Sequence, residues 1–372
     1  MIIAVNSRFL GETQPDDLEN FITECFSRLA VKYAQHQFLY IFNKPFDKDL
    51  NFPKNVTAVF AGPETKNTIL LQYWLNYKLP ALLRKYKAEV FVSIDGMCSL
   101  RTKLPQCMLV HDLSFLQYPG LLKKTQVRFL KKFTPLFLAK AKNIVTVSQF
   151  HRSLIIDQYK VDTGKIDTIY PGINKLFIPV SFEERELTKE KYAEGREYFL
   201  CLGSTGFNSN LINLLKAFSF FKKRQKSNMM LLIADKTDEQ FKQELKTFKF
   251  RNEVKLLEAL SKEDVAKITA AAYAMVHPVF YDAFATAPSG AMQCRVPVLC
   301  SNTDTLNELC GNAALYFNPE DFKDIAEKMM LVFKDEDMAK GLVRTGEIRC
   351  RDYDWDKTTG LLWQSILKAI DN

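Results

Sequence analysis

Short apolar runs rich in β-branched residues alternate with longer amphipathic stretches along the whole chain. The runs of the first half are IIAVN, FLYIFN, VTAVF, EVFVSI, CMLVHD, NIVTVS and IDTIYPG. Those of the second half are YFLCLGS, MMLLIA, VKLLEAL, AYAMVHPV, VPVLCS and AALYFNP. Helix-length segments such as DDLENFITECFSRLAVKYA fit between most of them. Buried strands that alternate with helices are typical of a parallel, doubly wound sheet, so the sequence predicts an α/β fold.

The alternation is interrupted once, near the middle of the chain. Residues 171–197 are polar and rich in charge, which is typical of a linker with a connecting helix. We therefore expect an N-terminal domain over 1–172, a linker over 173–197 and a C-terminal domain over 198–354. The final stretch, 355–372, predicts one more amphipathic helix. Two such domains are expected to face each other across a central cleft, the usual position of a small-molecule site.

The composition argues against several classes of protein. The chain begins MIIAVNSRFL, which resembles a strand rather than a signal peptide, and no apolar segment approaches the ~18 residues of a membrane span. A cytoplasmic protein is the resulting expectation. The cysteines show no CxxC spacing and several lie inside apolar runs, so we expect buried, reduced thiols. The four histidines lack metal-ligand spacing, which argues against a protein-bound transition metal.

The formal net charge of +8 is concentrated in one segment. Residues 121–142 contain seven Lys or Arg and no acid, and a helix over 121–133 would separate its basic residues from its apolar ones. A solvated surface helix is the favoured interpretation. The alternative is a face that rests on acidic lipid headgroups, giving peripheral contact with a membrane. No aromatic-basic interleaving or known motif supports binding to nucleic acid.

Several segments, in this order and spacing, resemble the family 4 glycosyltransferases, which have the GT-B fold. They are VHDLSFLQYP, TVSQFHRSLIIDQYKVDTGKIDTIYPGI, FLCLGS with NLLKAF, VHPVFYDAFATAPSGAMQCRVPVLCSN, NELCGNAALYFNPED and DYDWDKT. The resemblance runs nearly end to end and implies two Rossmann-like domains, with helix 355–372 crossing back to the first. It also implies sugar transfer with retention of configuration from a nucleotide-sugar to a glycan or lipid-linked acceptor. Neither a metal nor a cofactor is implied.

Three donor-side features of the family are altered. The family's donor loop carries two glutamates separated by seven residues, and Asp282 and Gly290 stand at these positions. An Arg-Lys pair that binds the diphosphate is replaced by Asn208 and Ser209. The Gly-rich turn after the first strand is replaced by GETQPDDLENF, in which Gly11 is the only glycine and the acids have the wrong sign for a diphosphate.

The resemblance assigns roles to a small set of residues. The catalytic candidates are His111 and Asp282. The donor-binding candidates are Gly11, Ser148, Thr205, Gly206, Asn208, Ser209, Phe284, Ala285, Gly290 and Glu308. The acceptor-binding candidates are Asp95, Gly96 and Arg101.

Several of these residues also have a purely structural interpretation. His111 would cap a strand end, the Asp95-Gly96 pair would form a turn, Ser148 would be a helix N-cap, and Glu308 would cap the helix after a strand. Two functions therefore stay open. One is an active glycosyltransferase with an altered donor site, and the other is a non-catalytic relative that binds a glycan or a partner transferase.

Overall fold

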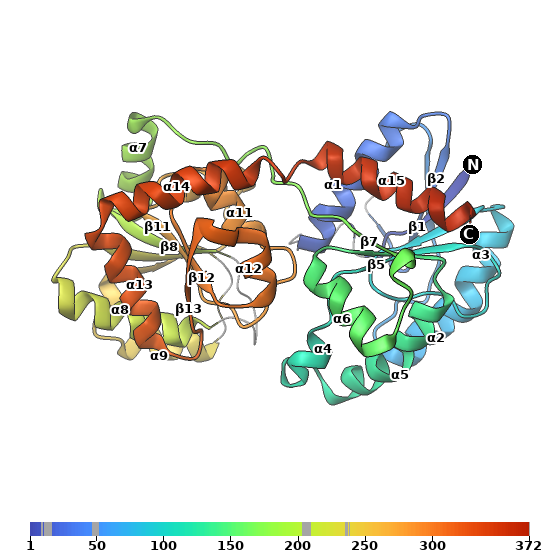
Figure 1. Ribbon diagram of the computed structural model, residues 1–372, viewed down its shortest axis with the longest axis horizontal. Helices are drawn as coiled ribbons and strands as arrows, with labels where there is room; N and C mark the ends of the chain where they lie inside the picture. Colours follow the sequence, from blue (N-terminus) through green and yellow to red (C-terminus); the bar gives the residue numbers. More distant parts are fainter. Residues whose placement is uncertain are drawn as a thin grey trace. The chain divides into compact units, whose positions relative to one another are not determined.

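The computed structural model describes residues 1–8, 10, 17–46, 52–202, 210–234, 237 and 239–371. They form two compact units, Met1–Gly172 with Asp354–Asn372, and Ile173–Tyr353. Each unit contains one sheet flanked by helices (Figure 1). The predicted α/β fold with parallel, doubly wound sheets is therefore confirmed.

The first unit is built on a seven-stranded sheet in the order β3-β2-β1-β4-β5-β6-β7, with every neighbouring pair parallel. The strands are β1 (Ile2–Asn6), β2 (Gln37–Phe42), β3 (Val56–Phe60), β4 (Val90–Ser93), β5 (Gln106–Val110), β6 (Asn143–Thr146) and β7 (Ile166–Thr168). The α-helices are α1 (Asp17–Lys32), α2 (Thr68–Tyr73), α3 (Leu79–Lys85), α4 (Ser114–Gln117), α5 (Lys124–Lys140), α6 (Gln149–Tyr159) and α15 (Trp355–Asp371). The π-helix η1 (Trp74–Lys78) joins α2 to α3, and η2 (Pro119–Leu121) and η3 (Thr163–Lys165) are 3₁₀ turns.

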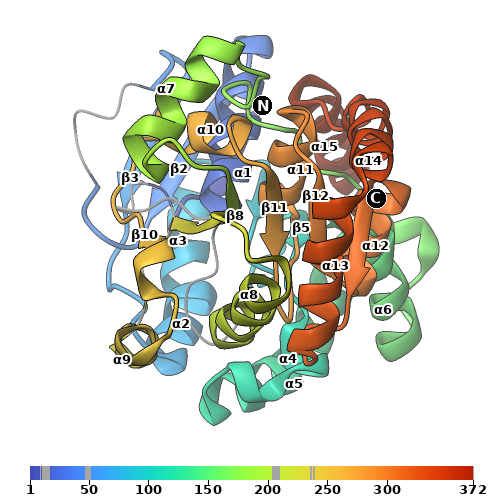
Figure 2. The same cartoon turned by 90° about the vertical axis from the view of Figure 1, so that its left-hand side faces the viewer.

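The second unit has a six-stranded parallel sheet in the order β10-β9-β8-β11-β12-β13. The strands are β8 (Tyr198–Leu202), β9 (Met230–Ala234), β10 (Val254–Leu256), β11 (Ala274–His277), β12 (Val298–Ser301) and β13 (Ala314–Phe317). The α-helices are α7 (Phe182–Ala193), α8 (Leu211–Gln225), α9 (Glu239–Thr247), α10 (Lys262–Ala270), α11 (Thr286–Gln293), α12 (Asp304–Cys310), α13 (Phe322–Lys334) and α14 (Glu336–Cys350). The 3₁₀ turns are η5 (Arg251–Glu253) and η6 (Gly311–Ala313). Helices α8 and α13 pack side by side against this sheet (Figure 2).

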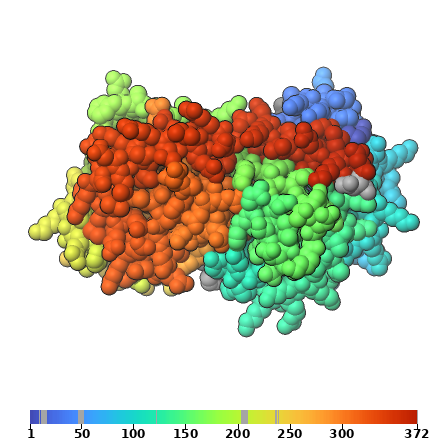
Figure 3. Space-filling model, in the orientation of Figure 1, coloured from blue at the N-terminus to red at the C-terminus, as the bar shows by residue number. Residues whose placement is uncertain are grey.

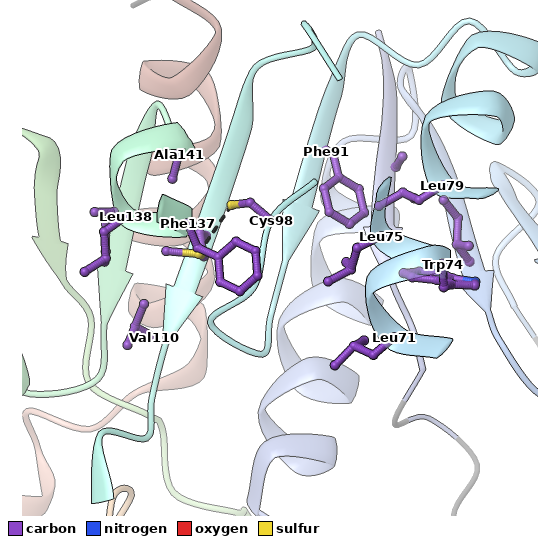
Figure 4. Packing of buried hydrophobic residues seen from close by; sticks show 14 of the residues in the cluster. Leu71, Trp74, Leu75, Leu79, Phe91, Cys98, Val110, Phe137, Leu138 and Ala141 are labelled. Carbon is purple, nitrogen blue, oxygen red and sulfur yellow. Dashed lines mark hydrogen bonds between the residues drawn. The ribbon is translucent and has the colours of Figure 1, made fainter. Parts of the chain in front are cut away.

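Each apolar run quoted above overlaps one strand of these sheets. Strands β4, β5, β6, β8, β11 and β12 are buried along their whole length. Parallel strands covered on both faces read as continuous apolar runs, which is why the sequence predicts them well. In the first unit, Leu71, Trp74, Leu75 and Leu79 of the α2–η1–α3 segment pack beside Phe91 of β4 (Figure 4).

Helix α15 packs on α1 in the first unit (Figure 1). The rings of Tyr33 and Trp363 stack with centroids 3.9 Å apart, and Lys368 Nζ lies 2.7 Å from Asp167 Oδ1. Gly172 ends the first segment of this unit, where a Cβ would lie 2.5 Å from the Trp355 ring. The absence of a side chain at position 172 therefore lets the chain pass directly against the start of α15.

The basic helix predicted over 121–133 has different bounds in the structure. Helix α5 begins at Lys124 and continues to Lys140, with Lys123 as an extended N-cap. The predicted separation of faces holds, because the basic residues are exposed and Phe129 is buried. Positions 121–123 lie outside the helix, because Leu121 ends η2, Leu122 is the C-cap of η2 and Lys123 is the N-cap of α5.

All eight cysteines are buried and none forms a disulfide, which confirms the predicted buried thiols. Burial raises the pKa of Cys294 to about 12 and that of Cys350 to about 12, so both stay protonated at neutral pH. Within the part of the chain that the structure describes, no helix is long and apolar enough to cross a bilayer.

Candidate functional site

A buried arginine lies at the carboxyl edge of the first sheet. Arg8 follows β1, is 6% exposed, and forms an ion pair with the carboxylate of Asp95, which follows β4. Its Nη1 also donates a hydrogen bond to Thr65 Oγ1 at 3.0 Å, and its guanidinium lies 5.4 Å from the Trp74 ring centroid. Parallel strands end at one edge of the sheet, so segments distant in sequence meet here, at the usual ligand-binding edge of such a fold.

Asp95 and Gly96 lie in a bend after β4, at the position where the structural alternative places an Asp-Gly turn. Gly96 has a positive φ of 71°, and its N–H donates to the Leu109 carbonyl at 2.8 Å. The Asp95 carboxylate accepts from Ser93 Oγ at 2.9 Å in addition to its ion pair with Arg8. Arg8 is not among the residues that the sequence predicts for this edge, although its place directly after a buried strand is a usable signal.

Two histidines follow the neighbouring strands β5 and β6. His111 comes directly after β5 and is half-buried. Ser148 is the N-cap of α6, as predicted, because its Oγ accepts from the His151 N–H at 3.1 Å. The same Oγ lies 2.6 Å from His151 Nδ1. Burial, with a smaller contribution from the charge of His111, lowers the pKa of His151 to about 4, so this ring is neutral at pH 7.

In the second unit, Asp282 is hydrogen-bonded within the loop between β11 and α11. Its Oδ2 lies 2.8 Å from Nε2 of His277, the last residue of β11. Its Oδ1 accepts from the backbone N–H groups of Phe284 and Ala285, both at 2.9 Å. Burial acts to raise the pKa of Asp282, but the hydrogen bond and charge of His277, with the two N–H donors, outweigh it and lower that pKa below its usual value.

This arrangement turns the Asp282 carboxylate toward the protein. Ala285, in the left-handed conformation with φ of 49°, is fully buried, and its carbonyl accepts from Ser289 Oγ at 2.7 Å. The N–H groups of Phe284 and Ala285 are bonded to Asp282. His277 is not predicted by the sequence, yet a histidine at a strand end five residues before an aspartate is a recognisable pattern.

Gly290 lies in α11 beneath an aromatic ring. A Cβ at this position would be 3.1 Å from three carbon atoms of the Phe177 ring, closer than ordinary van der Waals contact. Any side chain at position 290 would therefore require this ring to shift by a few tenths of an ångström. A glutamate there, as in the family, would require Phe177 to move.

The remaining predicted residues are placed as follows. Glu308 does not cap α12, so that structural alternative is wrong: Thr303 is the N-cap, accepting from the Leu306 N–H at 3.4 Å, and Glu308 lies one turn into the helix. Arg101 is exposed, with its guanidinium 4.2 Å from the Tyr77 ring centroid. Five predicted residues lie outside the described residues: Gly11, Thr205, Gly206, Asn208 and Ser209.

Two family models match the chain, one in each half. The Glycosyltransferase Family 4 model covers residues 30–175, and the Glycosyl transferases group 1 model covers residues 182–349. O-antigen chain mannosyltransferase B of Escherichia coli is 28% identical over 67% of this chain and 66% of its own length. O-antigen chain mannosyltransferase RfbU of Salmonella typhimurium is 27% identical over 68% of this chain and 66% of its own length. The chain thus spans just under two thirds of these relatives.

Solved structures resemble the chain over nearly its full length. WaaG, a glycosyltransferase involved in lipopolysaccharide biosynthesis, has a TM-score of 0.80 at 13% identity and covers 98% of this chain and 99% of its own. Sucrose-phosphate synthase from Thermosynechococcus elongatus has a TM-score of 0.81 at 18% identity, covering 99% of each chain. Anabaena HepE in complex with UDP and glucose has a TM-score of 0.76 at 13% identity, over 98% and 99%. At these identities the likeness shows the fold, and together with the two family models it places the chain among the GT-B glycosyltransferases.

Proposed function

We propose that the chain transfers a mannosyl group, with retention of configuration, from a nucleotide-sugar to a glycan or lipid-linked acceptor of the O-antigen type. The observation that carries this proposal is the match to two O-antigen mannosyltransferases, over 67% and 68% of the chain. HepE, which has this fold, has also been solved in complex with UDP-glucose, and this supports a nucleotide-sugar donor. No metal or cofactor is part of the proposal.

The residues at the first sheet edge are assigned to the sugar and the acceptor. His111 contacts the donor sugar near the reacting carbon, as the family resemblance implies. The Arg8 guanidinium, buried and held by Asp95 and Thr65, supplies a fixed positive charge at the same edge. A cation that is oriented before the reaction stabilises developing negative charge better than one that must reorganise.

Asp282 is assigned a positioning role. Because its oxygens bond His277 and two backbone N–H groups, it fixes the path of the donor loop and does not act as a free carboxylate. A carboxylate repels a diphosphate, so cations and N–H donors elsewhere must bind the departing group.

A non-catalytic role is the second candidate, and it is favoured by the two altered glutamate positions. At one, the carboxylate of Asp282 turns toward His277, and at the other, Phe177 fills the space beside Gly290. Such a protein would keep the two-domain fold in order to bind a glycan or a partner transferase.

Calorimetric titration with UDP, GDP, ADP, TDP and their sugar conjugates distinguishes the two candidates. Binding of one conjugate, followed by transfer of the sugar to a lipid-linked acceptor with the donor's anomeric configuration, supports the transferase. A folded protein that binds none of them contradicts it and supports the non-catalytic role.

We also propose that the basic face of α5 makes peripheral contact with acidic lipid headgroups. Lys124, Arg128, Lys131 and Lys132 are exposed on this helix, which contains no acidic residue and lies at the surface of the first unit (Figure 3). Flotation with phosphatidylglycerol vesicles tests this contact. Charge reversal by Lys131→Glu with Lys132→Glu should reduce flotation, and equal flotation of the variant and wild type would reject the proposal.

A further inference from the structure

An aromatic stripe lies on the outer face of the segment formed by α2 and η1. Ile69, Tyr73 and Tyr77 follow one another at intervals of four residues and are 79%, 43% and 51% exposed. Residues spaced by four lie on one face of a helix. The opposite face carries Trp74 and Leu75, which are fully buried (Figure 4). The core therefore fixes the orientation of the helix and keeps these three large side chains in solvent.

The two tyrosines form one continuous surface. Their ring centroids are 5.7 Å apart and their planes differ by 25°. A cation accompanies each ring: Arg101 lies with its guanidinium carbon 4.2 Å from the Tyr77 centroid, and Lys78 Nζ lies 6.0 Å from the Tyr73 centroid. The stripe thus combines two stacked tyrosine rings with a guanidinium that lies over one of them, and its phenol and guanidinium groups are hydrogen-bond donors.

The π-helical turn and a loop contact hold this surface in place. Residues Trp74–Lys78 form the π-helix η1, a rare geometry that occurs frequently at functional sites. Trp74 Nε1 donates to the Ala61 carbonyl at 2.6 Å, which anchors the turn to the loop after β3. Asn76 Oδ1 accepts from the Leu100 N–H at 3.0 Å, so the loop that carries Arg101 is tied to the same turn.

We propose that Ile69, Tyr73, Tyr77 and Arg101 form a platform that holds a glycan chain. Sugar rings present apolar C–H faces that stack on aromatic rings, and hydroxyl groups around the rim that accept hydrogen bonds from a guanidinium or a phenol. Exposed apolar surface bordered by polar groups marks a binding site. A single file of side chains suits a linear chain of rings, whereas a stable protein interface needs about 800 Å² on each partner.

The stripe runs away from the sheet edge that carries Arg8. Thr65, in the loop that leads into α2, is hydrogen-bonded to Arg8 at this edge. Tyr77 is nine residues beyond Thr68, where α2 begins, and at about 1.5 Å per residue this is about 14 Å. A glycan on the platform would have one end near this edge. That this end of the glycan is the one that accepts the sugar rests on the proposed function.

Affinity electrophoresis in native gels that contain α-mannan, dextran or a purified O-polysaccharide tests the platform without requiring sugar transfer. The variant combines Tyr73→Gln with Tyr77→Gln, because glutamine is at least as compatible with a helix as tyrosine. The control is Phe182→Gln, which removes a 77% exposed aromatic ring from α7 in the second unit. Thermal melting verifies that all three proteins are folded.

We expect at least one polysaccharide to retard the wild type and the control equally, and the dissociation constant of the double variant to be about tenfold higher. Equal retardation of the double variant and the wild type would overturn the platform. Retardation of the wild type by none of the three polysaccharides would also overturn it.

A transfer assay separates this inference from the proposed function. With a long acceptor, the double variant should have a higher KM than the wild type and the same kcat. With a monosaccharide acceptor, its KM and kcat should both equal those of the wild type. Absence of transfer by the wild type would count against the proposed function alone, because the electrophoretic result does not depend on turnover. Equal effects on long and short acceptors would count against the platform alone.

Discussion

His277 Nε2 and Asp282 Oδ2 lie 2.8 Å apart in the second unit, where the resembling family carries the first glutamate of its donor loop. The side chains are 3% and 10% exposed, so water barely competes for this contact. An aspartate is one methylene shorter than a glutamate, and here its carboxylate turns back on the strand end. The carboxylate of Asp282 thus bonds the strand end and the backbone of its own loop.

Replacing Asp282 with alanine should lower the free energy of unfolding by about 3 kcal/mol, because the buried His277 ring and two N–H groups lose their partner. Asp282→Asn is the matched control, since an amide oxygen still accepts from the two N–H groups and should cost less. Urea denaturation measures both. An alanine variant as stable as the wild type would contradict the anchoring role.

Acidification should destabilise the protein through His151. Burial lowers the pKa of this ring from 6.5 to about 4 in the folded state, so the unfolded chain binds a proton more readily. Stability that is present above pH 6.5 is then lost as the pH falls toward 4, by about 3 kcal/mol at most.

Urea denaturation at a series of pH values tests this expectation by comparing the wild type with His151→Gln. The variant lacks the titrating ring, so its stability should change less over the same interval. Parallel curves for the two proteins would exclude His151 as the source of the pH dependence.

Introducing a glutamate at position 290 should destabilise the second unit by about 1–3 kcal/mol, because its Cβ would meet the Phe177 ring at 3.1 Å. Adding Phe177→Ala should recover part of this loss by opening the space. The double variant should also bind a nucleoside diphosphate more tightly than Phe177→Ala alone, since the glutamate can then reach ribose hydroxyls. A fully stable Gly290→Glu protein would show that Phe177 does not restrict the position.

Replacing His111 with alanine should lower kcat about a hundredfold, while nucleotide-sugar binding changes far less, because a contact near the reacting carbon acts mainly in the transition state. His36→Ala is the control: His36 precedes β2 and lies at the amino edge of the same sheet. Single-turnover measurements with saturating donor give the rate. Equal rates for His111→Ala and the wild type would remove His111 from the catalytic candidates.

The sequence predicts the strands well and the polar contacts poorly, and the reason is the range of the interactions. A run such as CMLVHD identifies β5 because both faces of that strand are covered. Its strand residues are therefore nearly all apolar, and this is visible in the sequence. The cap of Ser148 on α6 is also local and is confirmed. The pairing of Arg8 with Asp95 joins positions 87 residues apart, and neither residue's neighbours indicate it.

In the loop between β11 and α11, polar contacts between residues close in sequence are also not predicted. Asp282 is recognisable from the order of residues around it, but its direction depends on His277 at the end of β11. In the sequence, Gly290 stands where the resembling family has a glutamate. Only the structure shows that the Phe177 ring lies beside this position. Glu308 fails as a cap because α12 begins at Asp304, four residues earlier.

Helix α15 belongs to the first unit, although the whole second unit separates α15 from the rest of the first unit in the sequence. During synthesis, the second unit is therefore complete before the first, because Ile173–Tyr353 leaves the ribosome while α1 still lacks its partner. The ring of Phe21 on α1, which packs edge-on against Trp355 with centroids 5.8 Å apart, lacks this contact throughout that interval. A stop codon after position 353 would consequently damage the domain synthesised first and spare the one synthesised last.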